Sequence, residues 1–402
     1  MRISARQLRR KFLGDKYNPV IFKKGSDRGI YAVGGYVRDT VRGVRSQDRD
    51  FVISGDLISF VREVRDIFGG TIVKFKKDNM VRLAVPNGLT FDFAAPMGTM
   101  EEDLLARDFT VNAIAWTPER GITDMHHGIE DLEKKRIRMI SESNLISDPL
   151  RLLRAYRFAA ELGGSIAKRT RDAIKTLHNR IENVSPERIT LELFHLLNSK
   201  RSSWYLREAL RDGVLADILS ISDKALEGNI RAIYKLEERM LEELPSGIKV
   251  LLDRIFSQNL TYKGLLCLEL LLQGRFRRAR RVRMSSNLVK RVQLSSIGVA
   301  ELKKRRSASK GKLFDIFVRL KDAALDVLII SGRMELFREY RKFRRIMKGG
   351  FLESKDIMKI MELGPGPLIG KSSLALRRAE FEGIVKSREE AVGFIRKRVS
   401  EA

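Results

Sequence analysis

Two aspartates one residue apart, Asp48 and Asp50, have a spacing that could support catalysis. They lie in the stretch DRDFV, and on a strand both carboxylates would face one side while Arg49 faces the other. Two ionised carboxylates this close repel each other unless a cation lies between them. Mg²⁺ supplies that charge, and a two-metal site can activate a hydroxyl and hold a triphosphate. The pair therefore predicts a Mg²⁺ site, with a polar strand end paired to arginine as the alternative.

A glycine pair precedes these aspartates, and a third aspartate follows them. Gly34 and Gly35 come directly after the apolar run IYAV, where glycine lets the backbone approach a phosphate and a following helix offers its N–H groups. Asp92 interrupts the apolar stretch LTFDFAA, where an unpaired buried charge is costly. We therefore expect Asp92 either to complete the catalytic site or to pair with a basic side chain.

A second cluster consists of four charged residues spaced by three: Asp148, Arg151, Arg154 and Arg157. On a helix this spacing lines one side, so the cluster presents one carboxylate acceptor and three guanidinium donors to a ligand. The alternative is a basic helix face packed against acidic neighbours.

The elements that must position these residues can be read from the hydrophobic pattern. It predicts strands over 30–35, 49–54, 70–75, 81–86 and 89–95, and an amphipathic helix over 56–69. From about residue 145 onward the pattern is helical, with hardly any strand signals. The chain is therefore predicted to be α+β, with a small mixed sheet followed by an all-α body.

The charge of the chain points to a polyanionic partner. Its 78 Lys and Arg exceed its 51 Asp and Glu, which gives a formal net charge of +27. Nucleic acid is the leading candidate, because Lys and Arg gain affinity by releasing counterions from the phosphate backbone. Basic clusters at 275–283, 303–312 and 337–350 predict such contacts in the helical body, although a single cluster is usually a solvated helix face.

Two further features bear on the compartment. The longest apolar runs, such as 265–272, are far shorter than the roughly 20 residues of a membrane span, so no membrane partner is expected. The single cysteine, Cys267, cannot form a disulfide within the chain, which suits a reducing cytoplasm.

Five motifs, in order, resemble those of the class II tRNA nucleotidyltransferases and bacterial poly(A) polymerases. GGYVRDTVRGVRSQDRDFVI resembles the catalytic motif, and LARDFTVNAIAW (105–116) resembles the second motif. TDMHHGIEDLEKKRIRMI (123–140) resembles the hinge, SDPLRLLRAYRFAAELG (147–163) the nucleotide-selecting helix, and SPERITLELFHLL (185–197) the helix that braces it. The resemblance implies a polymerase-beta-like nucleotidyltransferase head over 1–140, a helical neck over 141–200 and a tRNA-binding body and tail over 201–402.

The resemblance also implies roles for single residues. Asp48 and Asp50 would hold Mg²⁺, with Asp92 as a further catalytic carboxylate. Gly34 and Gly35 would cradle the triphosphate of CTP or ATP with help from Arg38.

The remaining roles concern the sugar and the base. Arg107 and Asp108 would contact the nucleotide, with Asp108 on the ribose 2′-hydroxyl. Asp148 and Arg151 would pair with the Watson–Crick edge of the base, while Arg154 and Arg157 would serve the phosphates or position Asp148.

Departures from the family pattern bear on the product. Between TFDFAAP and TMEEDLLARDF, little more than Pro96-Met97-Gly98 remains of a loop that is longer in CCA-adding members. Within the family a missing loop goes with CC-adding enzymes, whereas the tail at 364–395 resembles longer members, including A-adding ones. We expect CC addition because the loop lies at the active site.

The alternatives are full CCA addition, A addition, poly(A) synthesis and a non-catalytic RNA-binding protein of the same fold. Intact Asp48, Asp50 and Asp108 argue against the last, because a protein that only binds RNA gains nothing from carboxylates that face a polyanion.

Overall fold

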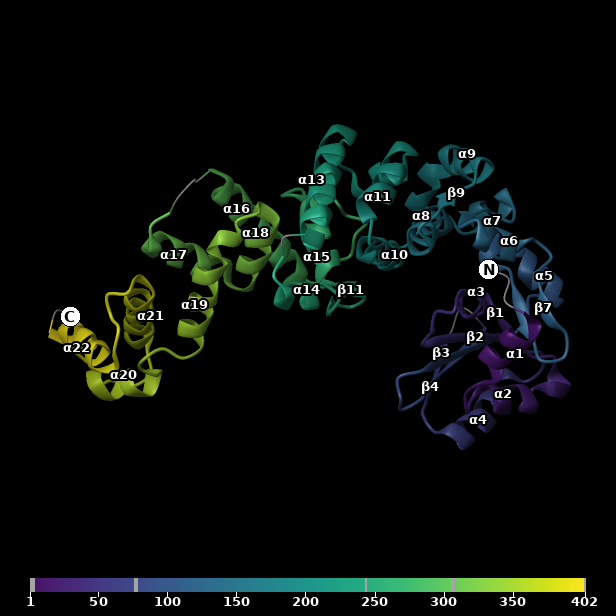
Figure 1. Ribbon diagram of the computed structural model, residues 1–402, viewed down its shortest axis with the longest axis horizontal. Helices are drawn as coiled ribbons and strands as arrows, with labels where there is room; N and C mark the ends of the chain where they lie inside the picture. The colour runs from purple at the N-terminus through teal and green to yellow at the C-terminus, as the bar shows by residue number, and fades with distance from the viewer. Residues whose placement is uncertain (1–3, 76–78, 243, 305–307, 401–402) are drawn as a thin grey trace. The chain divides into compact units, whose positions relative to one another are not determined.

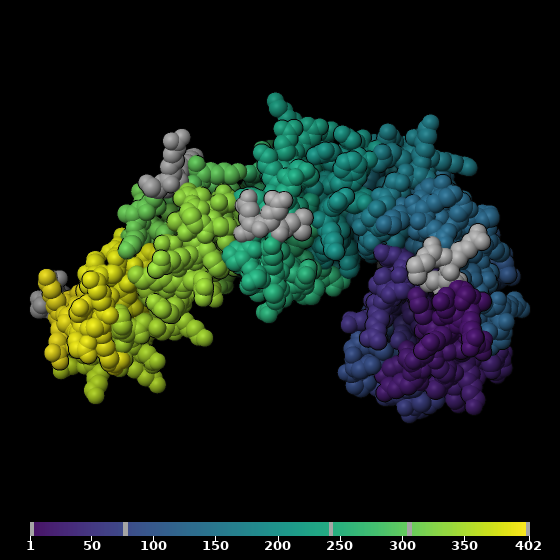
Figure 2. Space-filling view, in the orientation of Figure 1, coloured from purple at the N-terminus to yellow at the C-terminus, as the bar shows by residue number. Residues whose placement is uncertain are grey.

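The computed structural model describes residues 4–75, 79–242, 244–304 and 308–400; the others are grey in Figure 1 and Figure 2. The chain divides into two compact units, Met1–Ile218 and Leu219–Ala402. The predicted boundaries at 140/141 and 200/201 both fall inside the first unit and stay predictions. Part of the predicted basic cluster 303–312, residues 305–307, lies outside the described residues.

One seven-stranded mixed sheet organises the first half of unit 1, in the order β3-β4-β5-β2-β1-β6-β7. Strands β2 and β5 are parallel and the other neighbours are antiparallel. The strands are β1 (Tyr31–Val33), β2 (Asp48–Val52), β3 (Thr71–Phe75), β4 (Met80–Ala84), β5 (Thr90–Ala94), β6 (Ala115–Thr117) and β7 (Gly121–Thr123). The predicted strands and mixed sheet are therefore confirmed, although Gly34 and Gly35 belong to the next helix.

An aromatic core covers one face of this sheet. Phe51 and Phe93 of the central strands pack there with residues of four helices, and Phe12 stacks on Trp116 at 4.2 Å between ring centroids. The helices are α1 (Ala5–Leu13), α2 (Asn18–Lys24), α3 (Gly34–Arg42) and α4 (Leu57–Phe68) (Figure 1). The sequence analysis predicted α4 but no helix before residue 29. Because this face is filled by Phe51 and Phe93, the carboxylates of Asp50 and Asp92, one residue before each of them, lie on the other face.

A helical layer completes unit 1. Helix α8 (Leu150–Leu162) packs against α10 (Pro186–Asn198) and α11 (Ser202–Arg211). Eight residues of α8 are buried, so the helix presents only part of its surface to a ligand. The elements between the sheet and α11 also include α5 (Met100–Leu105), the turn Thr110–Asn112, α6 (Gly128–Glu133), β8 (Arg136–Ile137), α7 (Glu142–Ser147), β9 (Ser165–Ile166) and α9 (Lys168–Leu177).

Unit 2 is helical apart from the small hairpin of β10 (Ile255–Ser257) and β11 (Leu260–Thr261). Its helices are α13 (Asp223–Glu242), α14 (Ser246–Leu252), α15 (Tyr262–Leu272), α16 (Ser286–Lys304), α17 (Lys310–Leu320), α18 (Ala324–Ser331), α19 (Phe337–Lys348), α20 (Ser354–Met361), α21 (Pro367–Glu382) and α22 (Arg388–Ser400). Two aromatics of the basic stretch 337–350, Tyr340 and Phe343, are buried, whereas Phe337 is partly exposed and most basic residues of the stretch are exposed. Among the described residues, no helix has the length and apolarity to span a membrane.

Candidate active site

A polar cavity of about 460 Å³ lies in unit 1, between the sheet and α8. Eleven of the twelve residues that were selected from the sequence line this cavity, including Asp148 and two residues of the second motif. These eleven are Gly34, Gly35, Arg38, Asp50, Asp92, Arg107, Asp108, Asp148, Arg151, Arg154 and Arg157. The twelfth, Asp48, is exposed at the start of β2. Residues from three separate motifs, together with Asp92, therefore meet at one place.

The alternation predicted for DRDFV is present in β2. Phe51 is buried in the aromatic core, and Arg49 lies on the same side, where it pairs with Asp15 and lies 5.5 Å from the ring of Tyr36. Asp50 faces the opposite side and lines the cavity. The arginine between the two aspartates is thus removed from them, as the strand period requires.

Asp50 has no hydrogen-bond or ion-pair partner among the described residues. Burial raises the pKa of Asp50 to about 6, and the negative charges of Asp92 and Asp48 act in the same direction, against Arg107 and Arg38. A divalent cation would relieve this unfavourable charge. Asp48 and Asp50 thus fit a metal site as a pair. In the described part of the chain, no group of three or more Asp, Glu, His or Cys side chains could hold a metal ion.

Asp92 pairs with a basic side chain in this structure. It lies directly across from Asp50 in the parallel β2–β5 register, is 8% exposed, and faces Arg82 of β4. Arg82 donates from Nε to Oδ1 at 2.7 Å and from Nη2 to Oδ2 at 2.6 Å. This bidentate pair occupies both oxygens of Asp92. The structure thus gives Asp92 the partner that a buried carboxylate needs, and its part in catalysis stays a prediction.

Gly34 begins α3 at a position that only glycine fits well. Its φ is +64°, and a Cβ there would lie 2.6 Å from Nη1 of Arg107. The N–H of Gly34 donates to the carbonyl of Ile114 at 3.1 Å. This N–H group of the first helical turn is therefore not free to bind a phosphate. A Cβ on Gly35 would lie 3.7 Å from Oδ2 of Asp50, which is ordinary contact. The role of Gly34 is therefore the turn and the space that it leaves for Arg107.

Arg107 is held by Asp103, a residue that the sequence analysis did not select. Arg107 donates from Nε and Nη2 to Oδ2 of Asp103, at 3.2 and 2.9 Å. Asp103 also accepts from the N–H of Met97 at 3.4 Å, in the segment that follows β5. The spacing of four residues between Asp103 and Arg107 was a readable signal for this pair.

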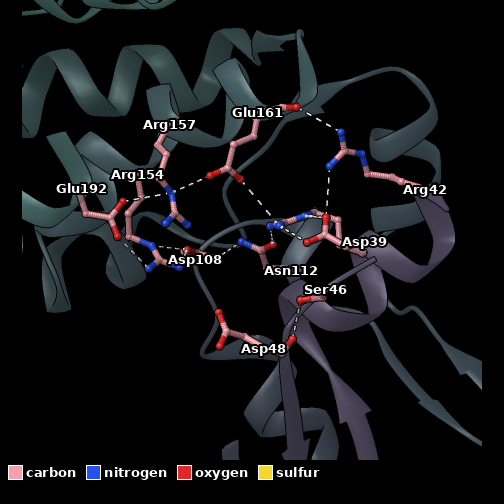
Figure 3. Close-up of polar contacts among 11 residues, drawn as sticks. Asp39, Arg42, Ser46, Asp48, Asp108, Asn112, Arg154, Arg157, Glu161 and Glu192 are labelled. Atoms are coloured by element: carbon pink, nitrogen blue, oxygen red, sulfur yellow. Dashed lines mark hydrogen bonds and ion pairs between the residues drawn. The ribbon is translucent and has the colours of Figure 1, made fainter. Parts of the chain in front are cut away.

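Asp108 is 4% exposed and lies at the centre of a second network. Arg154 donates to its Oδ2 from Nε at 2.8 Å, and Nη2 of Arg154 lies 2.7 Å from the same oxygen (Figure 3). Oδ1 accepts from Nδ2 of Asn112 at 2.9 Å and from the N–H of Phe109 at 2.8 Å. Burial acts to raise the pKa of Asp108, but Arg154 and these hydrogen bonds outweigh it and lower the pKa. Asp108 is thus ionised and fixed at both oxygens.

The arginines of α8 differ in their contacts. Arg154 also lies 3.4 Å from Oε1 of Glu192, and Arg157 lies 3.1 Å from Oε2 of Glu192 and 3.5 Å from Oε1 of Glu161, as Figure 3 shows. Burial acts to lower the pKa of Arg154, but Asp108 and Glu192 raise it overall. Arg154 therefore holds Asp108 in this structure, and its role at the phosphates or at Asp148 stays a prediction.

Asp148 lies just before α8, because the helix begins at Leu150 after Pro149. It does not continue the helical row of arginines, and Arg188 holds it from α10 at 3.2 and 2.8 Å. Arg151 donates to the carbonyl of Asn144 at 3.1 Å and has no carboxylate partner among the described residues. Arg151 is thus the cavity arginine most open to a ligand.

Comparisons with known proteins show which families and chains this protein resembles. Residues 72–138 match the poly A polymerase head domain, and residues 164–226 match the probable RNA and SrmB-binding site of polymerase A. The chain is 29% identical over 390 residues to the CC-adding tRNA nucleotidyltransferase of Synechocystis sp., which covers 90% of this chain and 92% of that protein. It is 35% identical over 176 residues to the A-adding tRNA nucleotidyltransferase of Deinococcus radiodurans, which covers 42% and 40%.

A solved structure has the same fold over almost the whole chain. The Thermotoga maritima CCA-adding enzyme, complexed with tRNA, superimposes with a TM-score of 0.72 at 20% identity and covers 99% of this chain and all of that one. The predicted combination of an α+β head and a helical body is thus confirmed.

Proposed function

The chain belongs to the class II tRNA nucleotidyltransferase and poly(A) polymerase family, and from that membership we propose that it adds cytidylates to the 3′ end of tRNA. The coarser activity, nucleotide addition to tRNA 3′ ends, is common to the relatives that match it. The observation that carries the proposal is the convergence of eleven expected residues on one cavity.

In the proposed reaction the tRNA 3′-hydroxyl attacks the α-phosphate of CTP and pyrophosphate leaves. Asp48 and Asp50 would hold the divalent metal, for which we propose Mg²⁺. Bound there, the metal would lower the pKa of the attacking hydroxyl and neutralise charge on the triphosphate. The partnerless carboxylate of Asp50 and the exposed carboxylate of Asp48 support this assignment.

The other cavity residues would bind and orient the nucleotide. Arg107, anchored by Asp103, would contact the phosphates above the Gly34 turn, and ionised Asp108 would accept a hydrogen bond from the ribose 2′-hydroxyl. Asp148 and Arg151 would read the base edge. Fixed groups of this kind stabilise the transition state without reorganising at the moment of reaction.

Two observations favour CC addition over full CCA addition. Strand β5 ends at Ala94 and α5 begins at Met100, with Thr99 as its N-cap, so only residues 95–99 connect them. Asp103 further holds this segment at Met97. A segment this short leaves little room for a loop that would reshape the site for ATP, and a CC-adding enzyme is similar in sequence over 90% of this chain.

Labelled nucleotides test the product. Given tRNA that ends at the discriminator base, the enzyme should incorporate CTP, and given tRNA that ends in CC it should incorporate little ATP. Strong ATP incorporation onto CC-ended tRNA would overturn CC addition.

Asp48→Ala and Asp50→Ala test the chemistry. Each should lower incorporation by about 1000-fold, because the metal-dependent charge stabilisation is lost. Asp66→Ala is a matched control, since Asp66 is exposed on α4 and, within the described part of the chain, pairs with its neighbour Arg65 alone. Near wild-type rates in both Asp48→Ala and Asp50→Ala would leave a non-catalytic RNA-binding protein as the better description.

A further inference from the structure

Phe158 of α8 lies beneath three arginines of the cavity. Its ring centroid is 5.0 Å from Cζ of Arg38, 5.0 Å from Cζ of Arg154 and 4.1 Å from Cζ of Arg157. The ring lines the cavity and is 3% exposed. The face of an aromatic ring attracts cations, and the attraction is strongest where water is excluded. A single buried ring thus supports three guanidinium groups of the site.

The edges of these guanidinium groups are held by other residues. Arg38 donates from Nη1 to Oδ1 of Asn112 at 2.8 Å and from Nε and Nη2 to Asp39, each at 3.0 Å. Arg154 bonds Asp108, and Arg157 lies between Glu192 and Glu161. Hydrogen bonds and ion pairs at the edge of a guanidinium group fix the group's position within its own plane. The aromatic ring beneath the group fixes the tilt of that plane. Without the ring, the three like charges would be free to tilt and separate.

Both oxygens of Asp108 depend on groups that rest on this ring. Oδ2 accepts from Arg154 directly. Oδ1 accepts from Asn112 at 2.9 Å, and Asn112 is in turn held by Arg38. A change in the tilt of Arg38 or Arg154 would therefore move the donors that aim the carboxylate.

We propose that Phe158 is a positioning residue that, through Arg154 and Asn112, aims Asp108 at the ribose and so sets the preference for ribonucleotides. This inference rests on the proposed function, in which Asp108 accepts from the 2′-hydroxyl. Phe158 itself does not touch the reacting atoms.

The test is the ratio of kcat/KM for CTP to that for dCTP, measured on tRNA that ends at the discriminator base. Phe158→Leu removes the aromatic face and keeps an apolar side chain, so the ratio should fall about tenfold towards the value of Asp108→Asn. Phe158→Tyr keeps the ring and should retain most of the wild-type ratio. Because both nucleotides are measured on one preparation, the ratio does not depend on the fraction of protein that is folded.

Phe194→Leu is the matched control for lost packing. Phe194 is fully buried on α10, which packs against α8, and no cation lies over its ring in the described part of the chain. The Phe194→Leu variant should lower the midpoint of thermal unfolding as Phe158→Leu does, and it should leave the CTP-to-dCTP ratio unchanged. A ratio in Phe158→Leu that equals that of Phe194→Leu overturns the positioning role.

The outcomes for the inference and for the proposed function are distinguishable. A wild-type enzyme that incorporates no nucleotide overturns both. An Asp108→Asn variant with an unchanged ratio overturns the ribose contact of Asp108, and with it the inference, but leaves cytidylate addition standing. The inference alone is overturned if the wild type is functional, the CTP-to-dCTP ratio falls in Asp108→Asn, and the ratio is unchanged in Phe158→Leu.

Discussion

Arg154 and Asp108, 46 positions apart in the sequence, form a buried ion pair in the cavity, with Nε and Nη2 at 2.8 and 2.7 Å from one carboxylate oxygen. The pair joins the second motif to α8, so the two segments that would contact the sugar and the base are fixed relative to each other. We therefore propose that Arg154 acts on the nucleotide through Asp108.

Arg154→Ala should destabilise unit 1 by about 3–5 kcal/mol, because it leaves a buried carboxylate without its partner. Arg188→Ala is a suitable comparison, since the side chain of Arg188 is 53% exposed and its pair with Asp148 should contribute about 1 kcal/mol or less. Urea unfolding of both variants measures the difference. Equal losses of stability would contradict the structural role given to the Asp108–Arg154 pair.

Gly34→Ala should cost about 1–2 kcal/mol of backbone strain, since Gly34 has a φ of +64°. The new Cβ would also push Arg107 away and lower kcat/KM for the nucleotide. Gly35→Ala meets only ordinary contacts and has no positive φ, so its free energy of unfolding should stay nearer that of the wild type. A Gly34→Ala protein as stable as Gly35→Ala would refute the conformational requirement.

Asp103→Asn should raise KM for the nucleotide and lower kcat/KM about tenfold, because a neutral amide holds Arg107 more weakly than a carboxylate does. The buried position of Asp103 also predicts a loss of stability of about 1–3 kcal/mol. Glu101→Gln, at an exposed position of the same helix, removes the same charge and should change neither quantity. Steady-state kinetics at varied CTP, with thermal unfolding, measures both effects.

Glu269→Gln should change how the stability of unit 2 depends on pH. Glu269 is 3% exposed; burial, followed by the charge of Asp326, raises its pKa well above 4.5, while Ser295 donates to it at 2.8 Å. Above about pH 4.5 the unfolded chain releases this proton while the folded chain retains it, so the free energy of unfolding falls as pH rises towards the folded pKa. The Glu269→Gln variant has no carboxyl group at this position, so its free energy of unfolding does not show this fall with rising pH.

Thermal midpoints between pH 5 and pH 8 provide the measurement. The midpoint of wild type relative to Glu269→Gln should fall across this range, whereas Glu335→Gln, at an exposed position, should track the wild type. A constant difference between wild type and Glu269→Gln would show that Glu269 is ionised in the folded protein.

Periodicity and residue type in the sequence were enough to predict the local features of the site. The period of two in DRDFV placed Asp50 opposite Arg49 and Phe51, and the glycine pair marked the turn into α3, because the side-chain direction in a strand and the freedom of glycine are local properties. The order of the motifs was enough to indicate the family and the α+β fold.

The pairing of charged groups, in contrast, depends on how the elements pack in three dimensions. Arg82 reaches Asp92 through the antiparallel β4–β5 register, and Arg188 reaches Asp148 from another helix, 40 positions away. Phe158 supports three arginines from two different helices. Periodicity assigns a side chain to a face, but strand order and helix packing bring distant faces together, and no local pattern encodes those distances.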